Sequence, residues 1–355
     1  MMFLAIVLAF MSATSVVGEY STLVFKEDFS KGLDFSIWKH EITMGGGGNW
    51  EFEYYANNRS NSFVRDKTLF IKPTLTADRM GKQQVSGEIP STLDLWGGTP
   101  ADVCTSNAFY GCSRGSGGGN VLNPIASARL RTVNSFSFKY GRLEIEAKLP
   151  RGDWLWPAMW LLPEDQAYGV WPASGEIDLV ESRGNDKSYP AGGNNCFGST
   201  LHFGPFWPED PYTLAHGEKC LDAGTLNDDF HTFGLYWSED HIYTYLDNDD
   251  NRVLDLPVNQ SFWQRGGWDK NPTLNNPWTG QPDVAPFDQK FYLIFNLAVG
   301  GVNGYFPDGQ GGKPWSDATS TAMADFNNAL DSVVKTWDMV GDDSALQIRS
   351  VKLYQ

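Results

Sequence analysis

The chain has 355 residues, a formal net charge of −16 at pH 7, 41% hydrophobic residues and 14 tryptophans. This acidity argues against nucleic acid and anionic membranes as partners, because Lys and Arg side chains supply the affinity for phosphates. An uncharged glycan is compatible with the composition.

The first 18 residues, MMFLAIVLAFMSATSVVG, carry no charged side chain and include a short apolar stretch. That stretch is too short to span a bilayer, and its end resembles a small-residue cleavage site. We expect residues 1–18 to be a signal peptide, and residues 19–355 to form one secreted, extracellular domain. A buried N-terminal strand is the alternative.

Strand-like runs recur along the rest of the chain, separated by turn signals. The run RLEIEAKLP alternates most clearly, with Leu143, Ile145, Ala147 and Leu149 on one side. The expected strands are 22–25, 68–71, 126–131, 142–149, 176–181, 199–203, 232–237, 242–247, 291–297 and 345–353. Only residues 320–335 show a helical pattern. Since no linker divides the chain, we predict an all-β fold, a single antiparallel β-sandwich.

Four cysteines in a secreted chain favour two disulfides. Proximity in sequence suggests Cys104–Cys112 and Cys196–Cys220, although three pairings are possible. None of the spacings is typical of zinc. Two sequons, at Asn58 and Asn259, are candidate glycosylation sites.

The stretch SGEIDLVES places three carboxylates within six positions. In a regular strand Glu176 and Asp178 share a face while Glu181 points to the other. A β-bulge inserts one extra residue and would bring Glu181 to the same face. The alternative is a solvated strand face on which Glu181 is an unrelated surface charge.

Two carboxylates about 5–5.5 Å apart, one ionised and one protonated, are the groups of a retaining glycosidase. An aspartate between them can hydrogen-bond the nucleophile and help hold the two pKa values apart. Aromatic rings for sugar faces are also present nearby, at Trp171 and in the stretch DWLWPAMW. We therefore favour a catalytic role for the three acids over the surface charge.

These segments resemble glycoside hydrolase family 16, the laminarinase-like β-glucanases, in the invertebrate-type form with an E-x-D-x-x-E motif. The resemblance covers most of the mature chain, through NWEFEYYANN, SARLRT, FKYGRLEIEAKLP, WPAMWLLPE, WPASGEIDLVES, STLHFG and FNLAVGG in that order. It implies a jelly roll whose concave sheet forms a glycan-binding cleft.

The resemblance also assigns roles. It makes Glu176 the nucleophile, Asp178 its assistant and Glu181 the acid/base of an endo-β-1,3-glucanase. It suggests residues that line the sugar subsites: Asn57, Arg129, Trp156, Trp160, Trp171 and His202. We expect no cofactor and no metal, and we expect a monomer whose partner is the polysaccharide. Many members bind calcium through an aspartate in the last strand, but Arg349 stands in that place here.

Other motifs point to weaker hypotheses. The sequence GCSRG around Ser113 matches a serine-hydrolase elbow but is followed by a glycine-rich loop instead of a helix. Residues 247–251, DNDDN, are better interpreted as a hairpin turn than as a calcium loop. The five histidines show no H-E-x-x-H pairing.

Two rival functions stay open at this point. One is a non-catalytic β-1,3-glucan recognition protein on the same fold, although such relatives typically lack one or more of the acids. The other is the same retaining chemistry on mixed-linkage glucan or a galactan.

Overall fold

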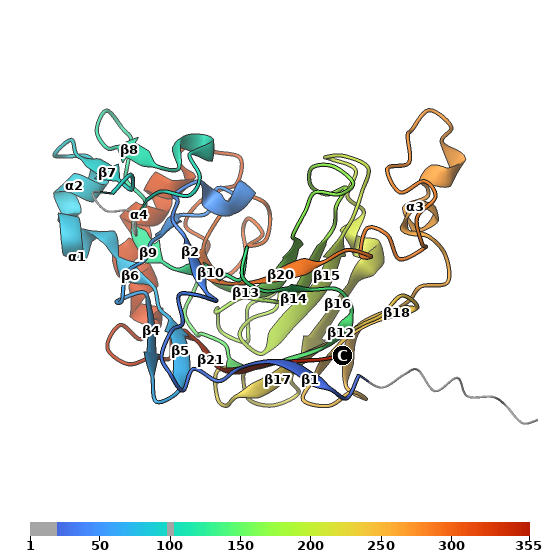
Figure 1. Cartoon of the computed structure of the whole chain (residues 1–355). Coiled ribbons are helices and arrows are strands. Elements are labelled where there is room, and N and C mark those ends of the chain that lie inside the picture. The colour runs from blue at the N-terminus through green and yellow to red at the C-terminus, as the bar shows by residue number, and fades with distance from the viewer. Residues whose placement is uncertain (1–19, 98–102) are drawn as a thin grey trace, which may run out of the picture.

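The computed structural model describes residues 20–97 and 103–355, so the predicted signal peptide lies outside the described residues. Two large antiparallel sheets lie one above the other, and irregular segments rise on both sides of the upper sheet (Figure 1). We call the lower sheet in that view the outer sheet and the upper one the inner sheet. The predicted antiparallel β-sandwich is confirmed.

In the described part of the chain each of these sheets has eight strands. The outer sheet runs in the order β19 (Arg252–Pro257), β18 (His241–Leu246), β17 (His231–Trp237), β12 (Gly141–Lys148), β21 (Leu346–Tyr354), β5 (Thr68–Ile71) and β4 (Ser62–Arg65), with β1 (Leu23–Glu27) paired to β21. The inner sheet runs in the order β16 (His216–Cys220), β15 (Cys196–His202), β14 (Glu176–Ser182), β13 (Leu155–Pro163), β20 (Phe291–Val299), β10 (Arg129–Arg131) and β2 (Lys39–Glu41), with β11 (Ser137–Phe138) paired to β20.

The hydrophobic core lies between the two sheets. Strand β12 alternates between buried and partly exposed residues along its whole length, as predicted, and Leu143, Ile145 and Ala147 are fully buried. They join one buried cluster with Met159 and Leu161 of β13. Each such large aliphatic side chain contributes about 1.5–3 kcal/mol by leaving water.

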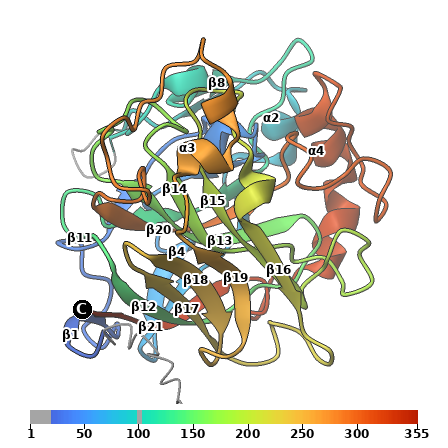
Figure 2. The same ribbon diagram turned by 90° about the vertical axis from the view of Figure 1, so that its right-hand side faces the viewer.

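The remaining elements flank the inner sheet (Figures 1 and 2). One lobe carries two small sheets, formed by β3 (Glu53–Tyr55), β9 (Ile125–Ser127) and β6 (Thr74–Leu75), and by β7 (Thr92–Asp94) and β8 (Ser113–Gly115). The helices are α1 (Thr76–Met80), α2 (Lys82–Ser86), α3 (Phe262–Arg265) and α4 (Ala322–Val333), with 3₁₀ turns at Gly46–Gly48, Ala108–Tyr110, Tyr212–Ala215, Trp268–Lys270 and Val334–Thr336.

Several details differ from the sequence-based expectation. The helix expected at 320–335 is present as α4 and a 3₁₀ turn, but α1, α2 and α3 were not expected, because four or five residues are too few for a helical pattern. The strand expected at 126–131 is divided at Ala128, where the chain passes from the small sheet to the inner sheet. Strands β3 and β9 are parallel, so the fold is not antiparallel throughout.

Both disulfides suggested by proximity are present, Cys104–Cys112 and Cys196–Cys220. Cys196 and Cys220 lie opposite each other on β15 and β16, so this bond ties the edge strand to the inner sheet. Among the described residues no helix is both long and apolar enough to cross a membrane.

Candidate active site

The three acids of SGEIDLVES lie on one face of β14 because the strand contains the predicted bulge. Asp178 pairs with Trp160 of β13 while Val180 pairs with Met159, so one extra residue, Leu179, is accommodated between them. The register towards β15 shifts at the same place. Leu179 and Val180 are both fully buried in the core. Glu176, Asp178 and Glu181 therefore share the opposite face of the inner sheet, which we call the site face.

Glu181 is held by a tryptophan of the neighbouring strand. Trp156 Nε1 donates a hydrogen bond of 3.0 Å to Glu181 Oε1. Burial, followed by the negative charge of Asp178, raises the pKa of Glu181 to about 7, although the Trp156 hydrogen bond acts in the opposite direction. A carboxyl group with a pKa of this value can both give and take a proton near neutral pH.

Asp178 is paired with a histidine that a second aspartate holds in place. His202 Nε2 lies 3.2 Å from Asp178 Oδ2, and His202 Nδ1 lies 2.6 Å from Asp210 Oδ2. The backbone N–H of Phe203 donates to the other Asp210 oxygen at 3.3 Å. Burial lowers the pKa of His202, but hydrogen bonds to Asp178 and Asp210 outweigh it and raise the pKa to about 12. His202 is therefore an imidazolium that is hydrogen-bonded to Asp210 and ion-paired with Asp178.

Glu176 lies opposite His202 in the register between β14 and β15. Burial and then the charge of Asp178 raise the pKa of Glu176 well above its ordinary value, while the His202 cation opposes this rise. The sequence led us to expect the pKa values of the two glutamates to be held apart. Both pKa values shift upward, because both glutamates lie in the same buried surroundings beside the same aspartate, and their separation stays a prediction. The acidic cluster therefore retains a proton near neutral pH.

Trp160 of β13 and Arg129 of β10, two of the predicted subsite residues, contact each other across β20, the strand between them. The Arg129 guanidinium lies 4.6 Å from the centre of a Trp160 ring, and Arg129 Nε lies 3.0 Å from Glu41 Oε2. Trp160 Nε1 donates to Asn296 Oδ1 at 2.7 Å. These contacts fix the orientation of the Trp160 indole.

The other predicted subsite residues differ in how much surface they offer. Trp156 is only 6% exposed, so it offers little ring surface for a sugar to stack on, and its contact with the site is the hydrogen bond to Glu181. Trp171 is 36% exposed, and its ring centre lies 5.7 Å from that of His202. Asn57 lies in the loop after β3, where its side-chain oxygen accepts a hydrogen bond from Arg59. The structure thus brings Trp156 and His202 to the acids and Trp171 to His202, whereas Asn57 contacts Arg59.

Three residues at the site were not found from the sequence. Asp210 follows His202 by eight residues through an irregular loop, so no strand period connects the two. Trp207, in the same loop, is 67% exposed and its ring lies 5.6 Å from that of Trp171. Tyr305 lies far from Trp156 in the sequence, yet its ring stacks on that of Trp156 with the ring centres 3.9 Å apart. Only the unusual density of aromatic residues around these positions could have drawn attention to them.

The ligand atoms of Glu176, Asp178 and His202 lie within 4.8 Å of one another, close enough to surround a metal ion. The donor set fits a metal poorly, because both nitrogens of His202 are directed at carboxylates and the imidazolium has no free lone pair. Cys196 and Cys220, which lie near Glu218, are joined in a disulfide and cannot act as thiolate ligands.

The weaker motifs have structural explanations. Ser113 begins the short strand β8 directly after a disulfide-bonded cysteine, which is not the strand-to-helix turn of a hydrolase elbow. Residues 247–251 form the turn between the antiparallel strands β18 and β19, as predicted. Arg349 lies 3.5 Å from the centre of the Phe230 ring and pairs with Glu146, and the expectation that calcium does not bind there stays a prediction. Asn58 and Asn259 are exposed, and their glycosylation also stays a prediction.

Comparison with known proteins identifies the family. The sequence signature of "Glycosyl hydrolases family 16" matches residues 121–264. The chain is 50% identical over 343 residues to a β-1,3-glucan-binding protein of Penaeus monodon, covering 95% of this chain and 91% of that protein. It is 32% identical to the glucan endo-1,3-beta-glucosidase A1 of Niallia circulans, covering 79% of this chain but 34% of that protein. The chain belongs to glycosyl hydrolase family 16.

A solved structure agrees with this assignment. The catalytic domain of an endo-1,3-beta-glucanase (laminarinase) from Thermotoga petrophila superposes with a TM-score of 0.58 at 25% identity, covering 94% of this chain and 97% of that domain. The two-sheet architecture is therefore the laminarinase-like jelly roll of the family, as the resemblance in sequence implied.

Proposed function

We propose that the protein is a retaining endo-hydrolase of β-1,3-glucan. The observation that carries this proposal is the bulge in β14, which puts Glu176, Asp178 and Glu181 on one face, together with a pKa of about 7 for Glu181. A retaining glycosidase needs two carboxyl groups that flank the scissile bond, one ionised as the nucleophile and one protonated as the acid.

The proposed reaction has two steps. Glu176 attacks the anomeric carbon as a carboxylate, and Glu181 donates its proton to the glycosidic oxygen, so that the leaving sugar departs as an alcohol. Glu181, now ionised, takes a proton from water, and the resulting hydroxide displaces Glu176 from the glycosyl ester. The reaction requires the proton of the acidic cluster to reside on Glu181. The positive charge that develops on the sugar favours the carboxylate form of Glu176.

His202 and Asp210 have a supporting role in this proposal. The imidazolium compensates the charge of Asp178, and Asp210 fixes the ring so that the charge stays beside Asp178. Without this cation three adjacent carboxylates would repel one another strongly in buried surroundings.

The names of the relatives support a β-1,3-glucan as the partner. The Penaeus monodon protein is named for β-1,3-glucan binding and the Niallia circulans protein for its endo-1,3-β-glucosidase activity. A net charge of −16 and exposed rings at Trp171 and Trp207 also suit a neutral polysaccharide.

Hydrolysis of laminarin with NMR detection of the first product tests the proposal. We expect a β-anomer first, and Glu176→Ala should lose at least about 1,000-fold in kcat. Azide should restore turnover in Glu176→Ala by giving the inverted glycosyl azide. Glu239→Ala, an exposed residue of the turn between β17 and β18, is the matched control and should keep full activity. An inverted first product from the wild type would exclude the mechanism.

A non-catalytic glucan-recognition protein is the second candidate, favoured by the name of the Penaeus monodon relative at 50% identity. Incubation with insoluble β-1,3-glucan separates the two functions. The enzyme releases soluble oligosaccharides and its Glu176→Gln variant only binds, whereas a recognition protein binds in both forms and releases nothing. Parallel assays on lichenan and agarose decide between β-1,3-glucan, mixed-linkage glucan and a galactan.

We further propose that residues 1–18 are removed on secretion and that the mature protein acts outside the cell as a monomer. Mass spectrometry of the protein released from expressing eukaryotic cells should find the new N-terminus near residue 19. It should also find glycans at the exposed Asn58 and Asn259. Retention of residues 1–18 in the released protein would contradict this proposal.

A further inference from the structure

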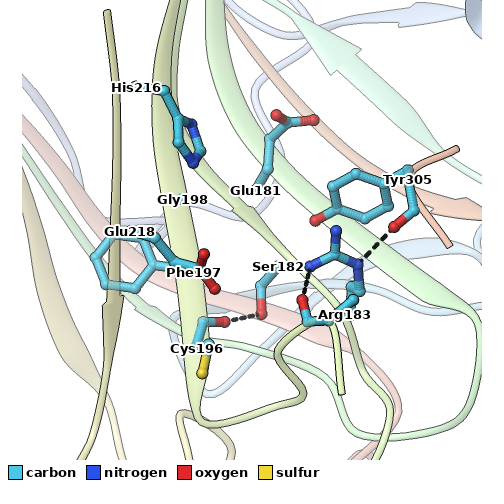
Figure 3. Close-up of a pocket in the computed structure, with 10 residues that line it drawn as sticks. Glu181, Ser182, Arg183, Cys196, Phe197, Gly198, His216, Glu218 and Tyr305 are labelled. Carbon is cyan, nitrogen blue, oxygen red and sulfur yellow. Dashed lines mark hydrogen bonds between the residues drawn. The ribbon is translucent and has the colours of Figure 1, made fainter. Parts of the chain in front are cut away.

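A polar pocket of about 100 Å³ lies beyond Glu181, between the end of β14 and the edge strand β16 (Figure 3). Its walls include Glu181, Arg183, Gly198, His216, Glu218 and Tyr305. Since Glu176 is at the other end of β14, the pocket lies on the side of Glu181 that is away from the proposed nucleophile. The two-step mechanism above gives this pocket no role.

Tyr305 contributes a buried hydroxyl that has no hydrogen-bond partner among the described residues. The ring cannot easily turn to find one, because Trp156 stacks on it at 3.9 Å and the Arg183 guanidinium lies 4.1 Å from its centre. In Figure 3 the hydroxyl points into the space bordered by Glu181 and Arg183. Buried hydroxyls are almost always hydrogen-bonded, so this one indicates a position for a polar group of a ligand or a water.

Arg183 adds a fixed donor beside this hydroxyl. Its Nε donates to the backbone oxygen of Tyr305 at 2.7 Å, and its Nη1 donates to the backbone oxygen of Ala191. These two bonds hold the guanidinium in place and leave Nη2 for another acceptor. Arginine held in this way is well suited to bind hydroxyl oxygens.

The opposite wall supplies an acceptor and the necessary space. Glu218 of β16 lies opposite Gly198 of β15. A side chain at Gly198 would place its Cβ 2.9 Å from His216 Cε1, so glycine keeps this wall open. The positive charge of Arg183 and the negative charge of Glu218 compensate each other, which suits a neutral ligand with several hydroxyl groups.

We propose that this pocket binds the hydroxyl groups of the leaving-group sugar, the sugar unit on the reducing side of the scissile bond. The inference rests on the proposed hydrolysis, because Glu181 protonates the oxygen that this sugar carries away. The sugar must therefore lie next to Glu181, and the pocket is the polar space that adjoins it. Tyr305, Arg183 and Glu218 then position the leaving group and favour substrates whose chain continues beyond the cleaved bond.

Tyr305→Phe tests the assignment because it removes the hydroxyl and keeps the ring on Trp156. The variant is assayed on laminaripentaose, whose leaving group is a sugar, and on a chloronitrophenyl β-laminaribioside, whose leaving group has no sugar hydroxyls. We expect kcat/KM to fall about 5- to 10-fold on the pentaose, the effect of one hydrogen bond, and to stay within about twofold on the aryl glycoside. Glu218→Gln should show the same selective loss. Tyr243→Phe, on β18 of the outer sheet, is the matched control and should change neither substrate.

Three results would overturn the assignment. Equal losses on both substrates would place the pocket on the non-reducing side or show a merely structural role. If both variants keep the wild-type kcat/KM on both substrates, the pocket takes no part in binding the substrate. If the wild type hydrolyses neither substrate, the proposed function itself is refuted, and the assignment with it.

Discussion

The ionisation of Glu181 should make the folded protein less stable as the pH rises, and Glu181→Gln should remove this effect. Burial and the charge of Asp178 raise the pKa of Glu181 from 4.5 to about 7. Because the folded chain then holds this proton more tightly than the unfolded chain, the free energy of unfolding falls as the pH increases from 4.5 through 7.

The structure also gives the size of this effect. At about 1.4 kcal/mol per pH unit, a pKa raised from 4.5 to about 7 corresponds to at most about 3 kcal/mol. Glu181 keeps some contact with solvent and shares the proton of the cluster. We therefore expect its ionisation to lower the free energy of unfolding by about 1–2 kcal/mol. Glutamine retains an oxygen to accept the Trp156 hydrogen bond and carries no charge. Glu181→Gln should therefore be more stable than the wild type by about 1–2 kcal/mol at pH 8 and equally stable at pH 4.5.

Chemical denaturation at the two pH values, followed by tryptophan fluorescence, measures this difference. Glu239→Gln, at an exposed turn, should change stability by less than about 0.5 kcal/mol at both values. If Glu181→Gln shifts the free energy of unfolding equally at pH 4.5 and pH 8, the reasoning about the buried charge is wrong.

Three further predictions concern other contacts of the site and the fold. Trp156→Phe removes the hydrogen bond that favours ionised Glu181, so the alkaline limb of the kcat/KM profile should move upward from pH 7 by about one pH unit; an unchanged limb would assign that limb to another group. Asp210→Asn weakens the hold on the His202 cation, so kcat should fall by about tenfold and the histidine should titrate at lower pH by NMR; an unchanged imidazole titration would show that Asp178 alone is sufficient. Cys220→Ser opens the link between β15 and β16, and the free energy of unfolding should fall by about 2–4 kcal/mol in a denaturant titration; a loss within experimental error would show that strand pairing alone holds this edge.

The sequence predicted the two-sheet architecture because most long strands carry an alternating or continuous apolar pattern. Strand β12 is the clearest example, and its inward residues are buried as predicted. Strand β13 was missed although it is central in the inner sheet, because Pro157 argues against a central strand. Its flanking apolar residues determine its place all the same. Propensity was here overridden by packing in the tertiary structure.

The site was predictable where its residues are close in sequence and not where loops bring them together. The parity of Glu176, Asp178 and Glu181 raised the possibility of the bulge, and the aromatic residues nearby and the family resemblance favoured it. Asp210 and Tyr305 reach the site through long irregular loops whose course depends on packing, and no local period encodes such a course. The shared upward shift of the two glutamate pKa values likewise depends on burial in three dimensions.

The bulge determines how the number of residues between Glu176 and Glu181 on β14 can change. Its extra residue enters the core side, where Leu179 and Val180 lie next to each other, and no residue is added to the site face. Deleting Leu179 would place the last glutamate four residues after the first, so that a regular strand would still direct all three acids to one side. The cost would fall on the core, about 2–5 kcal/mol if the space of one leucine is not refilled. The separation of the two glutamates along the strand is therefore set by how many aliphatic residues the core can accept, while their common orientation is preserved at either length.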